Sequence, residues 1–346
     1  MSTGRSGTRI EKIHHPGENG LGFTTLRKVI VTGANGFVGA AMAQRLVGEG
    51  WAVVGTFRDH NASLGGPKIL PFITGDINGK TDWAAALRGI DTVVHTAGRA
   101  HIVRDTAANN LSAFRRVNVQ GTENLARQAA EAGVKRFLFL SSVKVNGESR
   151  RVAYKETDKP APKDSYGISK MEAEQELLKI AAETGMAVII LRPPLVYGPK
   201  VKANFLRLIR IVDRGIPLPL AWVKNQRSLI YVENLADAIV RCIRHADVAF
   251  KTYLIRDDTD VTTPELIRLM ASALGKPSRL FGMSPKLLRN IAHLLGKENE
   301  TDRLIGSLIV DDSKIRRELN WNPPVKLKEG LKNTADWFKR TLCSGN

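Results

Sequence analysis

Residues 29–39 read VIVTGANGFVG, and this stretch decides the fold. Apolar residues run into Thr32, and glycines follow at Gly33, Gly36 and Gly39, directly before the small apolar run AAMA. This order predicts a buried strand that turns at once into a helix. Glycines let the backbone approach a pyrophosphate closely, and a helix N-terminus offers free N–H groups. The stretch therefore predicts a dinucleotide site, with a purely steric need for glycine as the alternative.

Short apolar runs alternate with helical patterns over residues 27–192. Strands that alternate with helices of this length predict an α/β fold, in which a doubly wound parallel sheet is covered by helices on both faces. Ligands of such sheets bind at the carboxyl ends of the strands. We predict strands at residues 29–31, 51–57, 69–73, 91–95, 136–141 and 187–191, and helices at residues 38–48, 107–132 and 164–183.

The regular alternation of strands and helices ends after Arg192, where prolines and glycines interrupt the sequence. We predict a Rossmann-type dinucleotide-binding domain over residues 27–192 and a smaller C-terminal substrate-binding lobe over residues 193–346. Residues 229–256 are expected to return to the sheet domain. Residues 1–26 are polar and aperiodic, so we expect a disordered extension there. In the C-terminal half we predict helices at residues 204–213, 234–245, 264–273, 285–295 and 327–340, and a strand at residues 252–255.

Composition and charge exclude several classes of protein. The chain has 346 residues, is 43% hydrophobic, and contains no apolar run near the roughly 18 residues that a membrane span needs. Its net charge of +18 is spread along the chain without an aromatic-studded basic module, which argues against nucleic acid as a partner. A basic solvated surface, or attraction to an anionic small molecule or a phospholipid surface, explains the charge better. Cys242 and Cys343 match no ligand spacing, so we expect no metal site and a reducing, cytoplasmic location.

Residues 284–297, SPKLLRNIAHLLGK, are amphipathic and basic. Such a helix can lie on a membrane surface, and peripheral membrane contact is therefore one reading. We predict instead that this helix packs against the sheet domain.

Two groups of polar residues follow the fifth predicted strand. Tyr166 and Lys170 are four residues apart, which places them on one face of a helix. A nearby ammonium favours the phenolate and lowers a tyrosine pKa from its usual value of about 10. Ser141 and Ser142 end the strand itself, where a hydroxyl can hydrogen-bond a reacting oxygen. The alternatives are a surface Tyr–Lys pair and a serine that merely caps the strand.

Taken in order, these motifs resemble the extended short-chain dehydrogenase/reductase superfamily, and more narrowly the NAD-dependent epimerase/dehydratase family that acts on nucleotide sugars. The resemblance covers residues 27–340. Within the family, the chain looks most like the branch of UDP-N-acetylhexosamine 4-epimerases and of the 4-reductases that form UDP-N-acetylquinovosamine. The motifs are TGANGFVG (32–39), DI (76–77), HTAG (95–98), NVQGT (118–122), SS (141–142), YGISK (166–170) and LRPPLVYGP (191–199).

The resemblance implies a role for each matching residue. Tyr166 is expected to be the acid/base at the C4 oxygen of the sugar, and Lys170 to hold the nicotinamide ribose and lower the pKa of the tyrosine. Ser142 is expected to hydrogen-bond the same oxygen, with Ser141 as the less favoured candidate. His95 is expected to be structural or to lie beside the cofactor, rather than to bind a metal.

The implied binding residues form two sets. The cofactor set, for NAD or NADP, contains Gly33, Asn35, Gly36, Phe37, Val38, Gly39, Arg58, Asp76, Ile77, Thr96, Ala97, Gly98, Asn118, Tyr166, Lys170 and Pro193. The substrate set contains Ser142, Lys144, Asn204 and Arg227.

Three departures from the family pattern narrow the prediction. Val143 and Lys144 stand where dehydratases carry an acidic pair, which argues against 4,6-dehydration. Arg58 follows the second strand, where NAD-preferring members have an acidic residue that binds the ribose 2′-OH, so the sequence slightly favours NADP. The next residue, Asp59, is acidic and favours NAD instead. Asn146 replaces a tyrosine found in many sugar epimerases, which leaves the substrate details open.

We therefore predict hydride-transfer chemistry at C4 of a UDP-(N-acetyl)hexosamine-type sugar in surface-polysaccharide synthesis. The reaction is either 4-epimerisation or reduction of a 4-keto sugar. The alternative is a catalytically idle NAD(P)-binding regulator or scaffold on the same fold. Family resemblance also implies a homodimer formed through the helices at residues 107–132 and 164–183.

Overall fold

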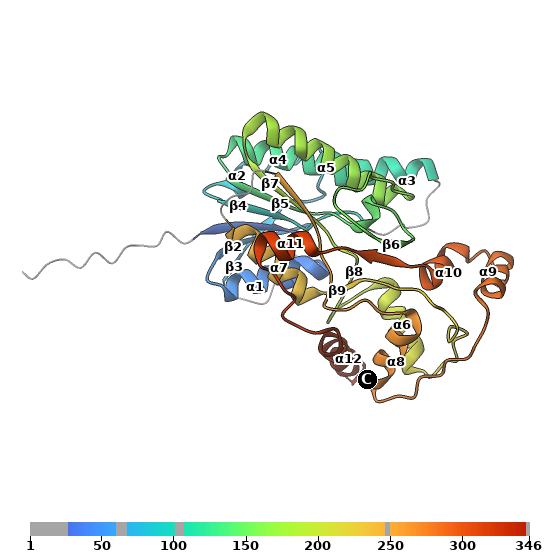
Figure 1. Ribbon diagram of the computed structural model, residues 1–346. Helices are drawn as coiled ribbons and strands as arrows, with labels where there is room; N and C mark the ends of the chain where they lie inside the picture. Colours follow the sequence, from blue (N-terminus) through green and yellow to red (C-terminus); the bar gives the residue numbers. More distant parts are fainter. Residues whose placement is uncertain (1–26, 60–67, 101–106, 246–249, 344–346) are drawn as a thin grey trace, which may run out of the picture.

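The computed structural model describes residues 27–59, 68–100, 107–245 and 250–343, so the predicted extension at residues 1–26 lies outside the described part. Its centre is a seven-stranded sheet with the strand order β10-β7-β5-β4-β1-β2-β3, in which all neighbours are parallel (Figure 1). The doubly wound α/β fold is thus confirmed. The strands are β1 (Lys28–Thr32), β2 (Ala52–Phe57), β3 (Ile69–Ile73), β4 (Thr92–His95), β5 (Arg136–Leu140), β7 (Ala187–Arg192) and β10 (Phe250–Leu254).

Helices cover both faces of the sheet, which explains why its central strands are almost wholly apolar. Helices α2 to α5 lie on one face, and α1, α7 and α11 lie on the other (Figure 1). Val29, Ile30 and Val31 of β1 have no exposed surface and divide between these two cores. The helices are α1 (Phe37–Gly48), α2 (Ala84–Leu87), α3 (Ala107–Phe114), α4 (Gly121–Glu131), α5 (Ser165–Thr184), α7 (Val232–Arg244) and α11 (Ser313–Leu319).

A further core, called the C-terminal core below, lies in the C-terminal half of the chain, around helices α6, α8 and α12. The start of α1 also contacts it, because Phe37 and Ala41 pack against its side chains. The elements of this half are α6 (Ala203–Asp213), α8 (Thr263–Leu274), α9 (Pro285–Leu294), α10 (Glu298–Ile305) and α12 (Leu327–Cys343), with the paired strands β8 (Leu195–Tyr197) and β9 (Leu229–Tyr231). Strand β11 (Leu308–Val310) pairs with β6 (Arg150–Tyr154) from the N-terminal half, and the two share a small core of their own.

A buried carboxylate links the elements at the junction of the two halves. Asp257 accepts hydrogen bonds from the Tyr197 hydroxyl at 2.7 Å, the Tyr231 N–H at 2.9 Å and the Asn234 amide at 2.8 Å. Burial raises the pKa of Asp257, and these three donors oppose that rise. Because Asn234 also donates to the carbonyl of Val325, the network reaches the segment that enters α12.

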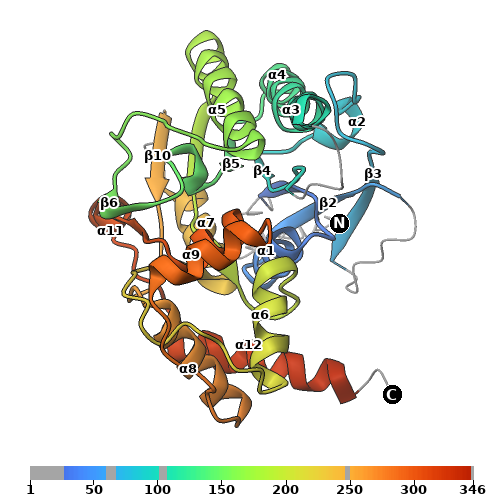
Figure 2. The same ribbon diagram turned by 90° about the vertical axis from the view of Figure 1, so that its right-hand side faces the viewer.

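The predicted strands and helices are confirmed, with shifts of one to three residues at their ends. The segment predicted at residues 107–132 is helical from Ala107 to Glu131, with a π-helical turn at Arg115–Gln120 in its middle. The packing predicted for the helix at residues 284–297 was wrong. Helix α9 does not pack on the sheet domain: it lies beside α10 (Figure 1), and its Leu288 contacts the C-terminal core. Figure 2 shows α9 above α8.

None of the described helices is both long and apolar enough to cross a membrane. The described residues also include no group of three or more His, Cys, Asp or Glu side chains placed to hold a metal ion.

Candidate functional site

The glycine turn joins β1 to α1 at the carboxyl edge of the sheet. Gly33 has a φ of +67°, and a Cβ on it would lie 3.0 Å from the Cα of Ala97. A Cβ on Gly39 would lie 2.1 Å from the carbonyl oxygen of Gly33, which no side chain can tolerate. Gly36 is the N-cap of α1, and no described side chain caps that helix end. The helix thus presents its N-terminal N–H groups beside a backbone cradle, as an anionic group requires.

The other residues predicted for this turn surround it. Asn35 is exposed, whereas Phe37 and Val38 are half-buried at the start of α1. The Thr96 hydroxyl donates to the carbonyl of Thr32 at 2.5 Å, and the N–H of Ala97 donates to the Thr32 hydroxyl at 3.1 Å. These bonds tie the ends of β1 and β4 together and hold Ala97 against the cradle.

His95 ends β4 and is buried. Its Nδ1 lies 2.7 Å from the Thr32 hydroxyl, and its Nε2 lies 2.9 Å from the Thr122 hydroxyl. Burial, with a smaller effect of Lys170, lowers the pKa of His95 to about 3. The imidazole is therefore neutral and links β1, β4 and α4, which agrees with the structural role predicted for it.

Arg58 and Asp76 meet at the ends of β2 and β3. The Nε of Arg58 lies 3.1 Å from an oxygen of Asp76, and both side chains are exposed. Ile77 lies against the first turn of α4, because a Cβ on Gly121 would come within 2.7 Å of its Cγ2. Two of the residues predicted to contact the adenosine half of a cofactor thus form one surface pair.

Asn118 lies in the π-helical turn and is buried. Its Oδ1 accepts from the N–H of Arg99 at 2.8 Å, and its Nδ2 donates to the Ser169 hydroxyl at 3.0 Å. A Cβ on Gly98 would lie 3.2 Å from Asn118 Oδ1 and 3.4 Å from Lys170 Nζ. The loop after β4 is therefore held directly beside the base of α5.

Lys170 is buried on α5. Its ammonium donates to the carbonyl of Leu140 at 2.8 Å and lies 4.3 Å from the centre of the Phe139 ring. Burial lowers the pKa of Lys170 to about 7, against an opposing effect of Glu174 one turn further along the helix. This lysine therefore loses its proton, and with it its positive charge, near neutral pH.

Tyr166 and Ser142 meet at the mouth of this site. Their side chains share a hydrogen bond, and the tyrosine ring lies edge-on to Phe114 at a centroid distance of 6.1 Å. Burial raises the pKa of Tyr166 to about 12; the Asp164 carboxylate adds to the rise, and the bond with Ser142 opposes it. The expected lowering of this pKa by Lys170 is absent: the ammonium donates to the carbonyl of Leu140 instead, and the pKa of the tyrosine is set by desolvation, Asp164 and Ser142.

The two adjacent serines have different partners. The Ser141 hydroxyl points inward and donates to Glu174 Oε1 at 2.5 Å. Glu174 in turn binds Arg192 through two bonds of 2.9 and 2.5 Å, and Arg192 donates to Asn146 at 3.1 Å. Ser142 is left facing Tyr166, with its oxygen accepting from the N–H of Lys144 at 3.3 Å.

This buried network was not predicted. Arg192 carried a signal, because it is a charged residue at the end of the apolar run AVIIL, whereas Glu174 lies in the polar run MEAEQE and carried none. The bidentate pair joins α5 to β7 behind the serine turn. Pro193, from the predicted cofactor set, supports the same turn, because its carbonyl accepts from the N–H of Val143 at 3.0 Å.

The residues predicted for substrate binding come from different elements of the fold. Lys144 lies next to Ser142 and pairs with Glu148 at 3.0 Å and with Asp164, the N-cap of α5. Arg227 donates to the carbonyls of Arg303 at 2.6 Å and Gly306 at 3.1 Å, so part of its guanidinium is committed to the protein.

Asn204 is exposed in the first turn of α6. The loop before it contains Lys200 with a φ of 70° and Ala203 with a φ of 54°. Residues other than glycine rarely occupy this left-handed region, and such strain is frequent at ligand-binding segments. The sequence gives no signal for this strain.

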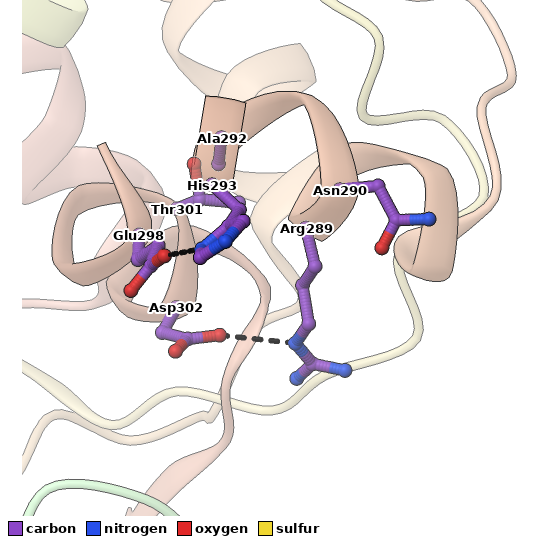
Figure 3. A pocket seen from close by; sticks show the side chains of 7 residues that line it. All are labelled: Arg289, Asn290, Ala292, His293, Glu298, Thr301 and Asp302. Carbon is purple, nitrogen blue, oxygen red and sulfur yellow. Dashed lines mark hydrogen bonds and ion pairs between the residues drawn. The ribbon is translucent and has the colours of Figure 1, made fainter. Parts of the chain in front are cut away.

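A hollow of about 240 Å³ lies between α9 and α10, away from these residues (Figure 3). None of its lining residues belongs to the predicted site. They are Arg289, Asn290, Ala292, His293, Glu298, Thr301 and Asp302.

Comparisons with known proteins agree with this geometry. The model of the NAD dependent epimerase/dehydratase family matches residues 29–255. A UDP-glucose 4-epimerase of Vibrio cholerae is 43% identical over 90% of this chain and 95% of that protein. An N-acetyl-alpha-D-glucosaminyl-diphospho-ditrans,octacis-undecaprenol 4-epimerase of Escherichia coli O157:H7 is 28% identical over 72% of each chain.

Among solved structures, MoeE5 in complex with UDP-glucose and NAD is similar, with a TM-score of 0.74 and 25% identity over 91% of this chain and 99% of that one. The glycine cradle, the strand order and these relatives lead to one conclusion: the chain belongs to the NAD-dependent epimerase/dehydratase family of nucleotide-sugar enzymes.

Proposed function

We propose that this protein is a UDP-sugar 4-epimerase that inverts C4 of a UDP-hexose or UDP-N-acetylhexosamine. The observation that carries the proposal is the pairing of Tyr166 with Ser142 at the mouth of the site, beside the buried Lys170. The Vibrio cholerae relative at 43% identity is a UDP-glucose 4-epimerase. Because the three proposed catalytic residues converge on the carboxyl edge of the sheet, the site is equipped for the same reaction.

The residues at the glycine turn fit a nicotinamide dinucleotide. A Cβ on Gly39 would fill the cradle, and the uncapped start of α1 offers N–H groups to a pyrophosphate. We propose that the cofactor set named above holds the dinucleotide, with Arg58 and Asp76 at the adenosine half and Lys170 at the nicotinamide ribose. When bound, the cofactor supplies acceptance and return of a hydride.

Tyr166 and Ser142 are proposed to act on the proton of the C4 hydroxyl. With a pKa of about 12, Tyr166 is a phenol at neutral pH and is ready to donate a proton to a developing alkoxide. In the oxidative direction Tyr166 first releases its own proton to solvent, which a nearby positive charge favours, and the resulting phenolate then takes the proton of the C4 hydroxyl. Ser142 hydrogen-bonds the same oxygen and orients it toward Tyr166.

Dehydration is not part of the proposal. Elimination across C5 and C6 needs an acidic pair after the serine, whereas this chain has Val143 and Lys144. Val143 is buried, and Lys144 is held by Glu148 and Asp164. Neither side chain can supply a carboxyl group to the substrate.

Reduction of a UDP-4-keto sugar is the second candidate, and Arg58 favours it. A reductase consumes a reduced cofactor at each turnover, and an exposed arginine at the end of β2 suits the 2′-phosphate of NADP. Asp76 neutralises part of that charge. We propose that NADP binds at least as well as NAD, and that Arg58→Ala weakens the binding of NADP more than that of NAD.

One assay separates the two candidates. Purified protein is incubated with UDP-glucose or UDP-N-acetylglucosamine, and the products are resolved while the nicotinamide absorbance is followed. Interconversion of C4 epimers without net change in absorbance supports the epimerase. Absorbance loss only with a 4-keto sugar supports the reductase, and cofactor binding without either reaction supports an idle regulator or scaffold.

We further propose that residues 27–192 form the cofactor domain, that residues 193–346 mainly form the substrate lobe, and that residues 229–256 return to the cofactor domain. A cytoplasmic location and a role in surface-polysaccharide synthesis complete the proposal, because cytoplasmic UDP-sugars are its expected substrates. A homodimer through the helical segment at residues 107–132 (α3, the π-helical turn and α4) and through α5 is the proposed assembly.

A further inference from the structure

Helix α9 carries an apolar face that nothing in the described structure covers. The four side chains of this face are 39% to 84% exposed, and Leu294 is the most exposed of them. Their spacing of four, three and one residues places them on one side of the helix. They are Leu287, Ile291, Leu294 and Leu295.

The opposite sides of the helix hold it in place. Arg289 binds Asp302 at 3.0 Å, and His293 contacts Glu298, so the polar side faces α10 (Figure 3). Leu288 packs on the C-terminal core, and Ala292 is buried. These contacts fix the orientation of α9 and direct the apolar face outward.

Two exposed aromatic residues are associated with the segment that leads into this helix, because Phe281 precedes the N-cap Ser284 by three residues and Trp222 packs on Gly282. Trp222 and Phe281 are both exposed, although their backbones are tied through the Ala221 N–H bond to the Phe281 carbonyl at 3.0 Å. The Trp222 ring lies against Gly282, where a Cβ would come within 2.1 Å of it. We call these two aromatics and the four apolar residues of α9 the α9 surface.

The segments that carry the α9 surface are exclusively basic. Residues 276–297 contain five lysines and arginines and no acidic residue: Lys276, Arg279, Lys286, Arg289 and Lys297. Residues 214–224 contain Arg214 and Lys224 and likewise no acidic residue. Among the described residues, no ion pair involves Lys286 or Lys297, which flank the apolar face at the two ends of α9.

We propose that the α9 surface docks the protein peripherally on a bilayer that contains anionic phospholipids. A helix with leucines, a tryptophan and a phenylalanine associated with the segment that leads into it, and flanking lysines has the composition that lies in a membrane interface. Exposed apolar area of this kind is a mark of an interaction site, and the positive charge selects a negative partner. A second copy of the same surface is disfavoured, because like charges would face one another.

In Figure 1, α9 lies at the edge of the molecule far from α1, α7 and α11, and α10 connects it back to β11. Contact with a flat surface at that edge therefore leaves the sheet and its covering helices free. Docking is independent of the proposed epimerase activity on a UDP-sugar in solution.

The test is co-sedimentation of the full-length protein with lipid vesicles. Phosphatidylcholine vesicles are compared with vesicles of phosphatidylcholine and phosphatidylglycerol, each in low salt and in about 1 M salt, where charges are screened within ~3 Å. We expect binding to the vesicles with phosphatidylglycerol, weaker binding to phosphatidylcholine alone, and a loss of the difference in high salt.

Two variants locate the contact. Leu294→Ser combined with Leu295→Ser should reduce vesicle binding at least about tenfold, because both leucines leave the apolar phase. The matched control is Leu70→Ser, since Leu70 on β3 is 66% exposed and Leu295 is 64% exposed. The control should bind like the wild type. UDP-sugar turnover in solution should be unchanged in both variants, which separates this test from that of the proposed function.

Two results would overturn the proposal. One is equal vesicle binding by the wild type and the double leucine variant. The other is no vesicle binding by the wild type. If the double variant then also changes its oligomeric state by light scattering, the α9 surface is an interface between two copies of the chain.

Discussion

Ser141 and Ser142 are adjacent in sequence but face different surroundings. Ser141 donates to the buried Glu174, whereas Ser142 meets Tyr166. A hydroxyl that holds a buried carboxylate contributes to stability, and one that faces a substrate contributes to turnover. The two serines can therefore be separated by experiment.

Ser142→Ala should lower kcat by roughly 100-fold, the typical effect of removing one hydrogen-bond donor from a reacting oxygen. Ser141→Ala should leave kcat nearly unchanged and lower the free energy of unfolding by about 1–3 kcal/mol, because Glu174 loses a partner. Steady-state kinetics and urea unfolding measure the two effects. The reverse pattern would assign the catalytic role to Ser141.

His95 makes stability depend on pH. Its pKa is about 3 in the folded protein, against 6.5 for an unperturbed histidine. Between these values the unfolded chain binds more protons, so the contribution of His95 is complete above pH 6.5 and is lost as the pH falls toward 3. From pH 6.5 to pH 5 this loss should reach about 2 kcal/mol. Urea unfolding at both pH values measures it.

His95→Gln is the matched variant for that titration, since an amide can hydrogen-bond Thr32 and Thr122 without titrating. The variant should be less sensitive to acid over the same range. An identical pH dependence in the wild type and the variant would show that other groups cause the acid destabilisation.

At the scale of elements, the join of β1 to α1 depends on contacts that only glycine permits. Gly39 lies in the first turn of α1, and Gly48 ends the same helix. A Cβ on Gly39 would overlap the carbonyl of Gly33, whereas a Cβ on Gly48 would meet nothing within 4 Å. A substitution at Gly39 therefore tests the close contact, and the same substitution at Gly48 of the same helix is its control.

Gly39→Ala should abolish measurable cofactor binding, because the turn must open to accommodate the methyl group. Gly48→Ala should bind the cofactor normally and be equal or greater in stability, by up to about 1 kcal/mol, since alanine favours a helix. Calorimetric titration with NAD and NADP, together with thermal unfolding, measures both. Normal binding by Gly39→Ala would contradict the proposed position of the pyrophosphate.

Elements differ in how far the sequence predicts them. The β1–α1 turn and α5 were predictable because their signals are local: recurring glycines in one, and a long helical pattern in the other. Strands β6 and β11 were not, because they are short and the paired residues Arg150 and Leu308 lie about 150 residues apart in the chain. The roles of Ser141 and Glu174 share this property, since they depend on how α5 packs against β5.

At the scale of the whole molecule, the exposed side of α5 is the proposed dimer interface. Leu178 lies there and is exposed. Leu178→Glu should convert a dimer into a monomer, because a charge buried at an interface loses its hydration. Leu342→Glu, at a similarly exposed leucine of α12, should leave the assembly unchanged. Size-exclusion chromatography with light scattering reads the mass of each variant, and a monomeric wild type would contradict the proposed assembly.

The central claim is that Tyr166 exchanges a proton with the C4 oxygen of a UDP-sugar while the hydrogen on C4 itself leaves and returns as a hydride. The most direct measurement is NMR of UDP-glucose or UDP-N-acetylglucosamine incubated with the enzyme in D₂O. The account predicts interconversion of the C4 epimers without deuterium at C4, and a rate lowered by ~100- to 10,000-fold in Tyr166→Phe. Deuterium at C4, or an unchanged rate in Tyr166→Phe, would contradict it.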